Sequence, residues 1–279
     1  MAAAGLLAFR EGLEAALILG IVFGVLRRVE RTDQFRLVWM GAGLAALVSL
    51  VGGAGLLALG VAFQGQAEEI FEGTAMLLAA GVLTWMIFWM GRQGRTIRTE
   101  LEQNVRQAAV AAGGWALFSL AFIAVLREGI ELALFLTAAA FTASAGAILV
   151  GGFAGLGAAA VAGWLLFATT RKLDIRAFFR VTSVLLILFA AGLVAHGIHE
   201  FNEAGWVPAV IEHVWDLNPV LDEGSGAGQL LKALLGYNGN PSLTEVVAYV
   251  GYWIVILLAL RLMKGQTEPL PEPSAGSRV

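Results

Sequence analysis

The sequence predicts an all-α integral membrane protein with seven transmembrane helices, built as two inverted three-helix repeats plus a seventh helix. Three observations lead to this fold class. The chain is 58% hydrophobic and 14% charged, with a mean hydropathy of +0.78, whereas soluble domains carry roughly 25% charged residues. Apolar runs of about 20 residues, the length that crosses a bilayer, occur seven times. A charged five-residue motif appears twice, at residues 10–14 and 127–131.

The first repeat, about residues 1–91, contains three of the expected helices. The first covers 4–26 and is expected to remain in the mature protein, because a cleavable signal peptide has a basic start and an uninterrupted apolar run. The second covers 37–62 and is rich in glycine and alanine, which lets helix backbones approach closely. The third covers 69–90 and opens with acidic residues.

The second repeat, about residues 113–200, follows the same order. Its helices are expected over 114–138, 145–169 and 178–200: a motif helix, a glycine-rich helix, and a helix with acidic residues at its outer end. Each repeat has an odd number of helices, so the second copy is inverted relative to the first, as in many secondary transporters.

The rest of the chain adds an outer loop, one helix and a tail. Apolar residues recur at helical spacing over 206–215 and 230–235, so the outer loop at 201–243 is predicted to hold two short amphipathic helices. The seventh helix covers 244–263, and together these parts form one transmembrane domain over residues 1–264. The proline-rich residues 265–279 are predicted to be a disordered cytoplasmic tail.

The basic residues set the orientation of the predicted helices. Fifteen of the 18 Lys and Arg residues follow the first, third, fifth and seventh helices and so fall on one side, with only Lys232 on the other. The positive-inside rule therefore places the N-terminus outside and the C-terminus in the cytoplasm. Ten of the 21 acidic residues lie on the outer side, where a negative surface concentrates cations.

The repeated motif is Arg-Glu-Gly-x-Glu at residues 10–14 and 127–131. Charges inside membrane helices are costly and usually mark a substrate or ion pathway. Spacing of three residues puts both glutamates of a motif on one helix face, and spacing of four puts the arginine beside the second glutamate. Because the two helices run in opposite directions, their carboxylates lie at about the same depth. The predicted centre consists of the ligands Glu11, Glu14, Glu128 and Glu131, oriented by Arg10 and Arg127.

A structural reading of the motifs is that they form an ion-pair knot that locks the first and fourth helices together. Four acids face only two bases, however, and an uncompensated buried carboxylate is costly. A bound cation would supply the missing charge. The chain has no cysteine, which excludes disulfides and thiolate metal sites.

Further oxygen and nitrogen donors gather at the outer ends of the third and sixth helices. The predicted outer capture set is Glu69, Glu72, His196, His199, Glu200 and Glu203. The glutamates of the third helix could instead be favourable charges at a helix N-terminus, and the histidines could be satisfied interfacial residues. All three histidines lie between residues 196 and 213, which favours a metal or proton role.

With these motifs the chain resembles the oxidase-dependent high-affinity iron permeases of fungi and bacteria, also called the iron/lead transporter family. Members have seven helices, an outside N-terminus and an Arg-Glu-x-x-Glu motif in the first and fourth helices, matched here at 10–14 and 127–131. Residues 69–73, 199–200 and 228–241 also resemble bacterial members, so the resemblance covers nearly the whole chain.

The resemblance implies a transporter rather than an enzyme, with iron as its substrate and no permanently bound cofactor. Fe³⁺ would be supplied by a separate extracytoplasmic ferroxidase or iron-delivery protein, because the chain has no fused domain of that kind. A hard ion suits carboxylate ligands. Two alternatives stay open: a transporter of divalent ions such as Fe²⁺, Mn²⁺ or Pb²⁺, and a membrane di-metal oxidase. The lipid bilayer and iron are the expected partners, and no nucleic acid is expected.

Overall fold

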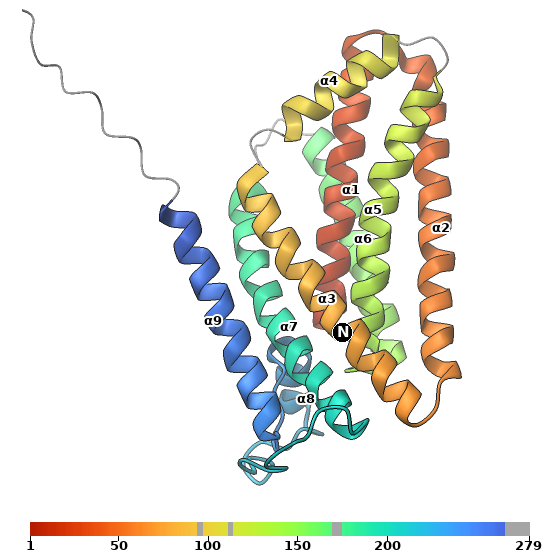
Figure 1. Cartoon of the computed structure of the whole chain (residues 1–279). Helices are drawn as coiled ribbons and strands as arrows, with labels where there is room; N and C mark the ends of the chain where they lie inside the picture. The colour runs from red at the N-terminus through yellow and green to blue at the C-terminus, as the bar shows by residue number, and fades with distance from the viewer. Residues whose placement is uncertain (94–96, 111–113, 169–174, 266–279) are drawn as a thin grey trace, which may run out of the picture.

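The computed structural model describes residues 1–93, 97–110, 114–168 and 175–265, and this part of the chain folds into α-helices and one short 3-10 helix (Figure 1). Apart from Gly265, the predicted disordered tail lies outside the described residues. The elements are α1 Ala2–Arg28, η1 Thr32–Gln34, α2 Phe35–Ala62, α3 Gln66–Gln93, α4 Ile97–Val110, α5 Trp115–Ala140, α6 Ala145–Ala168, α7 Ile175–Glu203, α8 Gly226–Leu235 and α9 Leu243–Gly265.

A long helix forms over each of the seven segments predicted from hydropathy, namely α1, α2, α3, α5, α6, α7 and α9. Within the described residues, five helices are long and apolar enough to cross a membrane: Thr32–Ala62, Gln66–Met90, Ala145–Leu166, Phe179–Glu203 and Leu243–Leu262. The other two, α1 and α5, carry the charged motifs. The charges that make these two helices less apolar are therefore those of the candidate site.

The long helices run alternately up and down, and their most extensive contacts join α1 with α6, α2 with α5, and α3 with α7 (Figure 1). α1 and α5 also pack against each other in the interior, while α9 lies against α7. The predicted closeness of the glycine-rich helices is confirmed. A Cβ on Gly155 of α6 would lie 2.8 Å from the backbone nitrogen of Phe9 in α1, and a Cβ on Gly53 of α2 would lie 3.1 Å from Ala133 of α5.

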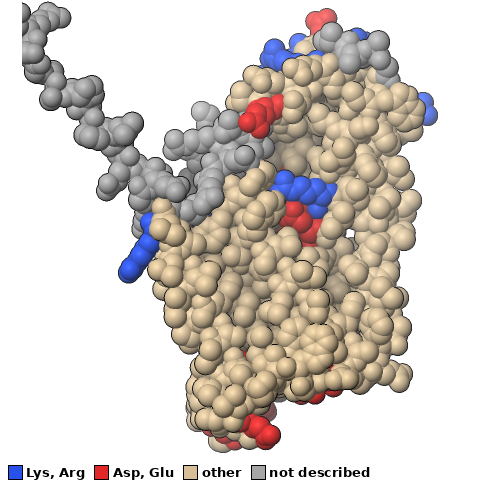
Figure 2. Space-filling view, viewed as in Figure 1, with Lys and Arg blue, Asp and Glu red and all other residues tan. Residues whose placement is uncertain are grey.

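Charged side chains are concentrated at the two ends of the bundle, as the space-filling view shows (Figure 2). The surface between the ends is mostly uncharged, which suits contact with lipid. One exception lies at mid-height, where acidic and basic side chains are visible in a hollow between α3 and the α1–α5 pair (Figure 2). Some charged side chains within the bundle are therefore visible from this side.

Helix α4 was not predicted. It is amphipathic, and Val105, Ala108 and Ala109 on one face pack against Val22 and Leu26 of α1. A search for long apolar runs misses such a helix, because its 14 residues are polar on average. It covers the end of the bundle that also holds the α1–α2 connection (Figure 1).

The prediction of an amphipathic helix over 206–215 is wrong. Residues 204–225 are irregular, and Val210 has a positive φ of 62°. The backbone makes its hydrogen bonds with distant residues instead: the Val214 nitrogen donates to the Pro241 carbonyl at 3.0 Å, and the Leu217 nitrogen to the Gly239 carbonyl at 2.7 Å. Most of the apolar residues at helical spacing in this loop are exposed, among them Trp206 at 62%, Val210 at 73% and Ile211 at 50%.

The prediction of a second short helix is confirmed by α8. Ser225 caps its start, its hydroxyl oxygen accepting a hydrogen bond from the Gly228 nitrogen at 3.0 Å. Gly236 ends the helix in the left-handed conformation, with a φ of 69°, which glycine adopts without steric cost.

Candidate metal centre

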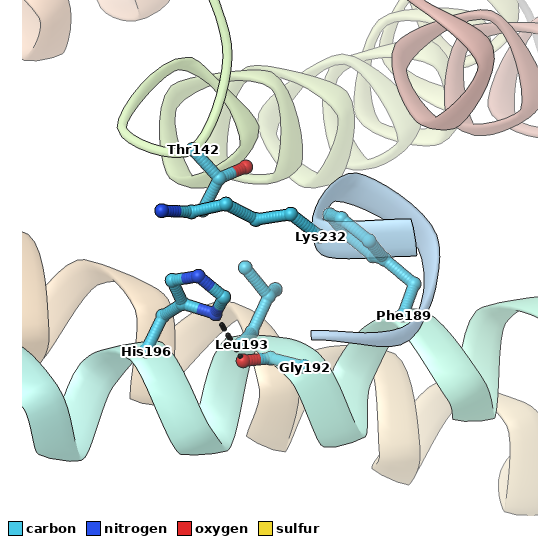
Figure 3. A pocket seen from close by; sticks show the side chains of 6 residues that line it. All are labelled: Thr142, Phe189, Gly192, Leu193, His196 and Lys232. Atoms are coloured by element: carbon cyan, nitrogen blue, oxygen red, sulfur yellow. Dashed lines mark hydrogen bonds between the residues drawn. The ribbon is translucent and has the colours of Figure 1, made fainter. Parts of the chain in front are cut away.

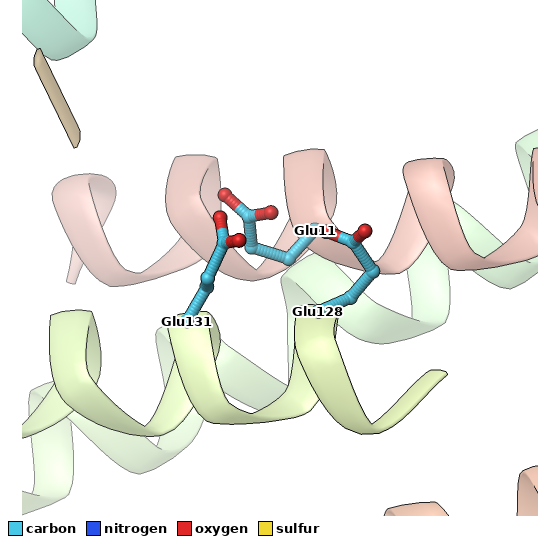
Figure 4. Close-up of side chains that lie close together, drawn as sticks. All are labelled: Glu11, Glu128 and Glu131. Carbon is cyan, nitrogen blue, oxygen red and sulfur yellow. The ribbon is translucent and has the colours of Figure 1, made fainter. Parts of the chain in front are cut away.

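The two motifs meet where α1 and α5 pack together. Glu11 on α1 and Glu128 and Glu131 on α5 each offer a carboxylate oxygen, and these oxygens lie within 4.8 Å of one another (Figure 4). Glu11 lies nine residues after the start of α1, and Glu131 nine residues before the end of α5, which agrees with the predicted common depth. In the part of the chain that the structure describes, no other set of three acidic or histidine side chains is gathered so closely.

All three carboxylates are buried, with Glu11 1%, Glu128 4% and Glu131 7% exposed. On each of them the Oε2 atom is buried and has no hydrogen-bond partner. Buried carboxylate oxygens are normally paired, because removing them from water without a partner is costly. A cation bound between the three groups would satisfy these oxygens, and hard metal ions take such ligands.

Arg10 is held entirely inside the bundle, with 1% of its surface exposed. Its Nη1 donates to Glu11 Oε1 at 2.7 Å, and its Nη2 forms an ion pair with Glu14 Oε1 at 2.9 Å. The same two nitrogens also contact sulfur on α3: Met86 Sδ at 3.0 Å and Met90 Sδ at 2.9 Å.

Arg127 occupies the equivalent position in the second motif but is more open, with 36% of its side chain exposed. Its Nε donates to Glu131 Oε1 at 3.0 Å and lies 4.0 Å from Glu128 Oε1. The guanidinium carbon lies 4.5 Å from the centre of the Trp89 ring. The predicted pairing of each arginine with the glutamate four residues later is thus confirmed in both motifs.

Glu14 has a different place from the other three predicted ligands. It pairs with Arg10 and is not part of the group whose oxygens lie within 4.8 Å. The structure therefore brings three of the four predicted carboxylates together and leaves the fourth beside the arginine.

The glycine of each motif faces away from the carboxylates and contacts a neighbouring helix. A Cβ on Gly12 would lie 2.9 Å from Ala159 of α6, and a Cβ on Gly129 would overlap the side chain of Ser49 on α2. Only glycine therefore fits at these points without a shift. The close packing of α6 against Gly12 and of α2 against Gly129 leaves the glutamates of each motif on the helix face that is turned toward the other motif.

The outer donors are brought together by a close crossing of α3 and α7. A Cβ on Gly73 would lie 2.9 Å from the Gly197 carbonyl oxygen, so the two backbones touch there. As a result the charge of Glu72 interacts with those of Glu200 and Glu203. The charge of Glu69 likewise interacts with that of Glu200. These groups share one region, but their ligand atoms are not gathered as tightly as those of the central group.

His199 is joined to α9 through a carboxylate that the sequence analysis did not single out. Its Nδ1 lies 3.1 Å from Glu245 Oε1, and its Nε2 lies 3.3 Å from Glu203 Oε1. Glu245 is 3% exposed and also accepts hydrogen bonds from the Asn238 side chain at 2.8 Å and the Ser242 nitrogen at 3.1 Å. Both ring nitrogens of His199 thus have protein partners.

His196 lies in a small pocket between α7 and α8 (Figure 3). Its Nδ1 is 3.1 Å from the Gly192 carbonyl oxygen, while its Nε2 is buried and has no hydrogen-bond partner. Lys232 and Thr142 line the same pocket. Beside a lysine, His196 is poorly placed to receive a cation from the acidic groups.

Four residues of this region were missed in the sequence: Met86, Trp89, Met90 and Glu245. The first three lie within an ordinary apolar helix, where a methionine or tryptophan normally signals packing or an interfacial belt. Glu245 stands in the first turn of α9, where an acidic residue is common. Their partners come from distant parts of the chain, so spacing alone gave no signal.

The chain is similar over most of its length to known permeases. Residues 1–268 match the model of the "Iron permease FTR1 family". The chain is 38% identical over 260 residues to the "Ferrous iron permease EfeU" of Shigella sonnei (strain Ss046), covering 92% of this chain and 94% of that protein. The protein of the same name from Yersinia pestis is 34% identical over 277 residues, covering 98% and 95%.

No solved structure matches the chain. The five helices that can cross a membrane and the permease relatives make this an integral protein of the cytoplasmic membrane. The match over residues 1–268 spans both motif helices and the outer loop. The chain therefore belongs to the iron permease FTR1 family.

Proposed function

We propose that this protein carries iron across the cytoplasmic membrane through the group formed by Glu11, Glu128 and Glu131. The observation that carries the proposal is the set of three buried carboxylates, each with an unpartnered oxygen, contributed by two helices in the bundle interior. Membership of the iron permease family and the names of the relatives support iron as the cargo.

Charge balance favours Fe²⁺ at the centre. The two motifs hold four carboxylates and two arginines, which leaves two negative charges when all six groups are ionised. A divalent ion neutralises them, and burial of uncompensated charge is costly. The relatives are also named as ferrous iron permeases.

A second candidate is Fe³⁺ supplied by a separate extracytoplasmic ferroxidase or iron-delivery protein. The oxygen-only character of the central group favours it, because hard ions prefer carboxylates. Mn²⁺ and Pb²⁺ remain competing cargoes that the same carboxylates can bind.

We also propose seven membrane-crossing helices arranged as two inverted repeats, with the N-terminus outside. If α1, α2 and α3 correspond to α5, α6 and α7, then the α1–α6 contact corresponds to the α2–α5 contact, and both are among the most extensive. The matching positions of Gly12 and Gly129 against their neighbours support the same relation. Most Lys and Arg residues follow the first, third, fifth and seventh predicted helices, and the positive-inside rule places these connections in the cytoplasm, which supports the orientation.

Under this orientation the proposed path starts at the α3–α7 crossing. Glu69, Glu72, Glu200 and Glu203 form the capture site, and the mutual repulsion of their charges favours a bound cation. His199 assists through Glu203, and His196 remains the least supported member of the set. The ion then reaches the central group, where Arg10 and Arg127 orient the carboxylates.

The test is uptake of iron by the purified protein in liposomes that contain an iron-quenched fluorophore. Fe²⁺ kept reduced by ascorbate, Fe³⁺ as its citrate complex, and Mn²⁺ are each added outside. We expect rapid quenching with Fe²⁺, and little with a Glu128→Gln variant, which keeps the side-chain shape without the charge. Equal rates for the wild type and this variant would contradict the central site.

The same assay separates the candidates. If the protein takes up Fe³⁺ but not Fe²⁺, the second candidate is favoured. A membrane di-metal oxidase would instead retain metal and turn over a substrate without any ion flux.

A further inference from the structure

A five-residue stretch of α3, residues 86–90, contacts the arginines of both motifs. Met86 and Met90 contact the guanidinium of Arg10 through their sulfur atoms at 3.0 and 2.9 Å. Trp89 presents its ring face to the guanidinium of Arg127 at 4.5 Å. The two arginines come from helices of different proposed repeats, so one segment of a third helix contacts both.

None of these three side chains is charged. A thioether sulfur is a weak hydrogen-bond acceptor, and an aromatic ring attracts a cation through its negative face. Among the described residues, the ion-pair partners of the arginines are carboxylates: Glu11 and Glu14 for Arg10, and Glu131 and, at 4.0 Å, Glu128 for Arg127. The α3 segment therefore supplies uncharged contacts to both guanidinium groups.

Two of the carboxylates take part in two interactions, one with an arginine and one with the proposed metal ion. Glu11 and Glu131 pair with the arginines, and both also belong to the central group of three. A metal ion bound there draws the same carboxylates toward itself. Arg10 is 1% exposed and its Nε already lacks a hydrogen-bond partner, so water cannot replace the carboxylates it loses.

We propose that Met86, Trp89 and Met90 are positioning residues that hold the two arginines while their glutamates bind the metal ion. This inference rests on the proposed function. A metal ion bound by the carboxylates does not draw the sulfur atoms or the indole ring away from the arginines. These groups therefore remain partners of the arginines in the metal-bound state. They matter more there than in the metal-free state, because the guanidinium groups then have fewer other acceptors.

The expected consequence concerns affinity rather than fold. Removing the sulfur atoms or the ring face raises the free energy of the metal-bound state more than that of the metal-free state. The iron concentration at half-maximal uptake therefore rises, whereas the maximal rate changes less. A side chain that only fills space would not produce this split when it is replaced by one of similar volume.

The variants are chosen to separate contact from packing. Met86→Leu/Met90→Leu keeps the apolar volume and removes both sulfur atoms. Trp89→Leu removes the ring, whereas Trp89→Phe keeps an aromatic face. The matched control is Met76→Leu, because Met76 is a fully buried methionine of α3 that packs in the apolar core.

The experiment measures the Fe²⁺ concentration dependence of uptake in liposomes for the wild type and these variants, with iron binding to the detergent-purified proteins as a second readout. We expect Met86→Leu/Met90→Leu and Trp89→Leu to raise the half-maximal concentration roughly 3- to 10-fold. Met76→Leu should match the wild type, and Trp89→Phe should lie closer to the wild type than Trp89→Leu. The single variants Met86→Leu and Met90→Leu replace the double variant if it is not recovered folded.

The possible failures differ. If the wild type takes up and binds iron but the α3 variants behave like Met76→Leu, the positioning role is wrong and the proposed function stands. If Trp89→Phe is as impaired as Trp89→Leu, the ring-face contact is not the cause. If the wild type neither binds nor transports iron, the proposed function fails and this inference fails with it.

Discussion

Glu11 and Glu14 lie three residues apart on one face of α1, yet they have different surroundings. Glu11 is within the group of three carboxylates, whereas Glu14 meets Arg10 outside it. Both share the same arginine, whose Nη1 and Nη2 each take one of them. At the scale of residues, the centre thus consists of three ligands and one glutamate that anchors a cation of the protein.

This difference predicts unequal effects of removing each charge. We expect Glu11→Gln to lower the affinity for Fe²⁺ about tenfold or more, which is about 1.4 kcal/mol or more, because a ligand charge is lost. Glu14→Gln should lower it less, through the weaker hold on Arg10. Iron binding to the purified variants checks the order, and an effect of Glu14→Gln as large as that of Glu11→Gln would make Glu14 a fourth ligand.

The hydrogen bonds of Glu245 predict that the outer network stabilises the fold. Glu245→Ala leaves His199, Asn238 and Ser242 without their acceptor, and an unsatisfied buried donor costs roughly 1–3 kcal/mol. We expect a lower Tm for the iron-free protein in detergent, by about 2–4 °C for each kcal/mol. Glu212→Ala, on an exposed glutamate of the irregular segment 204–225, is the control.

If Glu245→Ala leaves the Tm unchanged but abolishes iron uptake, the structural role of Glu245 is wrong. His199 and Glu245 would then act on the ion rather than on the fold. The connection of α7 to α9 would have to rest on the remaining contacts between these helices.

At the scale of elements, the motif helices are pressed together from behind. Gly12 lets α6 approach α1, and Gly129 lets α2 approach α5. The carboxylates meet on the opposite faces of these helices. The distance between the two motifs therefore depends on helices that carry no charge in the site.

This packing predicts that Gly129→Ala is damaging although alanine favours helices. The added Cβ overlaps Ser49, and overpacking typically costs about 1–3 kcal/mol. Gly43→Ala on α2 is the control, because a Cβ there meets nothing within 4 Å. Thermal unfolding should separate the two variants, and adding Ser49→Gly to Gly129→Ala should recover part of the loss. Equal Tm values would mean that α2 shifts freely.

The crossing of α3 and α7 carries a prediction about capture. Glu72→Gln removes one of the charges gathered beside Glu200 and Glu203. Uptake at low iron should fall several-fold, while uptake at saturating iron stays close to that of the wild type, because the central group is untouched. Transport rates over a range of Fe²⁺ concentrations measure this. An unchanged concentration dependence would leave Glu72 as a favourable charge near a helix N-terminus.

At the scale of the whole molecule, the bundle has two chemically different ends. The space-filling view shows acidic side chains at the end that holds α8, and basic side chains mainly at the opposite end (Figure 2). The positive-inside rule relates the basic end to the cytoplasm. The orientation can therefore be tested without reference to transport.

The absence of cysteine from the sequence makes this test direct. Val220→Cys places a single thiol in the outer loop at a position that is 86% exposed, and Thr32→Cys places one in the exposed α1–α2 connection. A membrane-impermeant maleimide should label the first in intact cells and the second only after the membrane is opened. The reverse pattern would invert the proposed topology.

The sequence by itself determined a large part of this protein. Long apolar runs gave the positions of the seven long helices, because a membrane helix needs about 20 apolar residues and little else. The duplicated motif gave the candidate site, since buried charges are rare enough to stand out. The helical period also gave the pairing of Arg10 with Glu14 and of Arg127 with Glu131, because residues four apart share a face.

Only the tertiary structure decided which groups meet. That Glu11 joins Glu128 and Glu131 while Glu14 does not, that α3 contacts both arginines, and that Glu245 holds His199 all depend on contacts between distant helices. Helix α4 was decided by its packing against α1, and the irregular loop at 204–225 by backbone hydrogen bonds to residues 239–243, rather than by hydrophobic period. Periodicity fixes which face of a helix a residue occupies, whereas the neighbour of that face is set by how the helices pack.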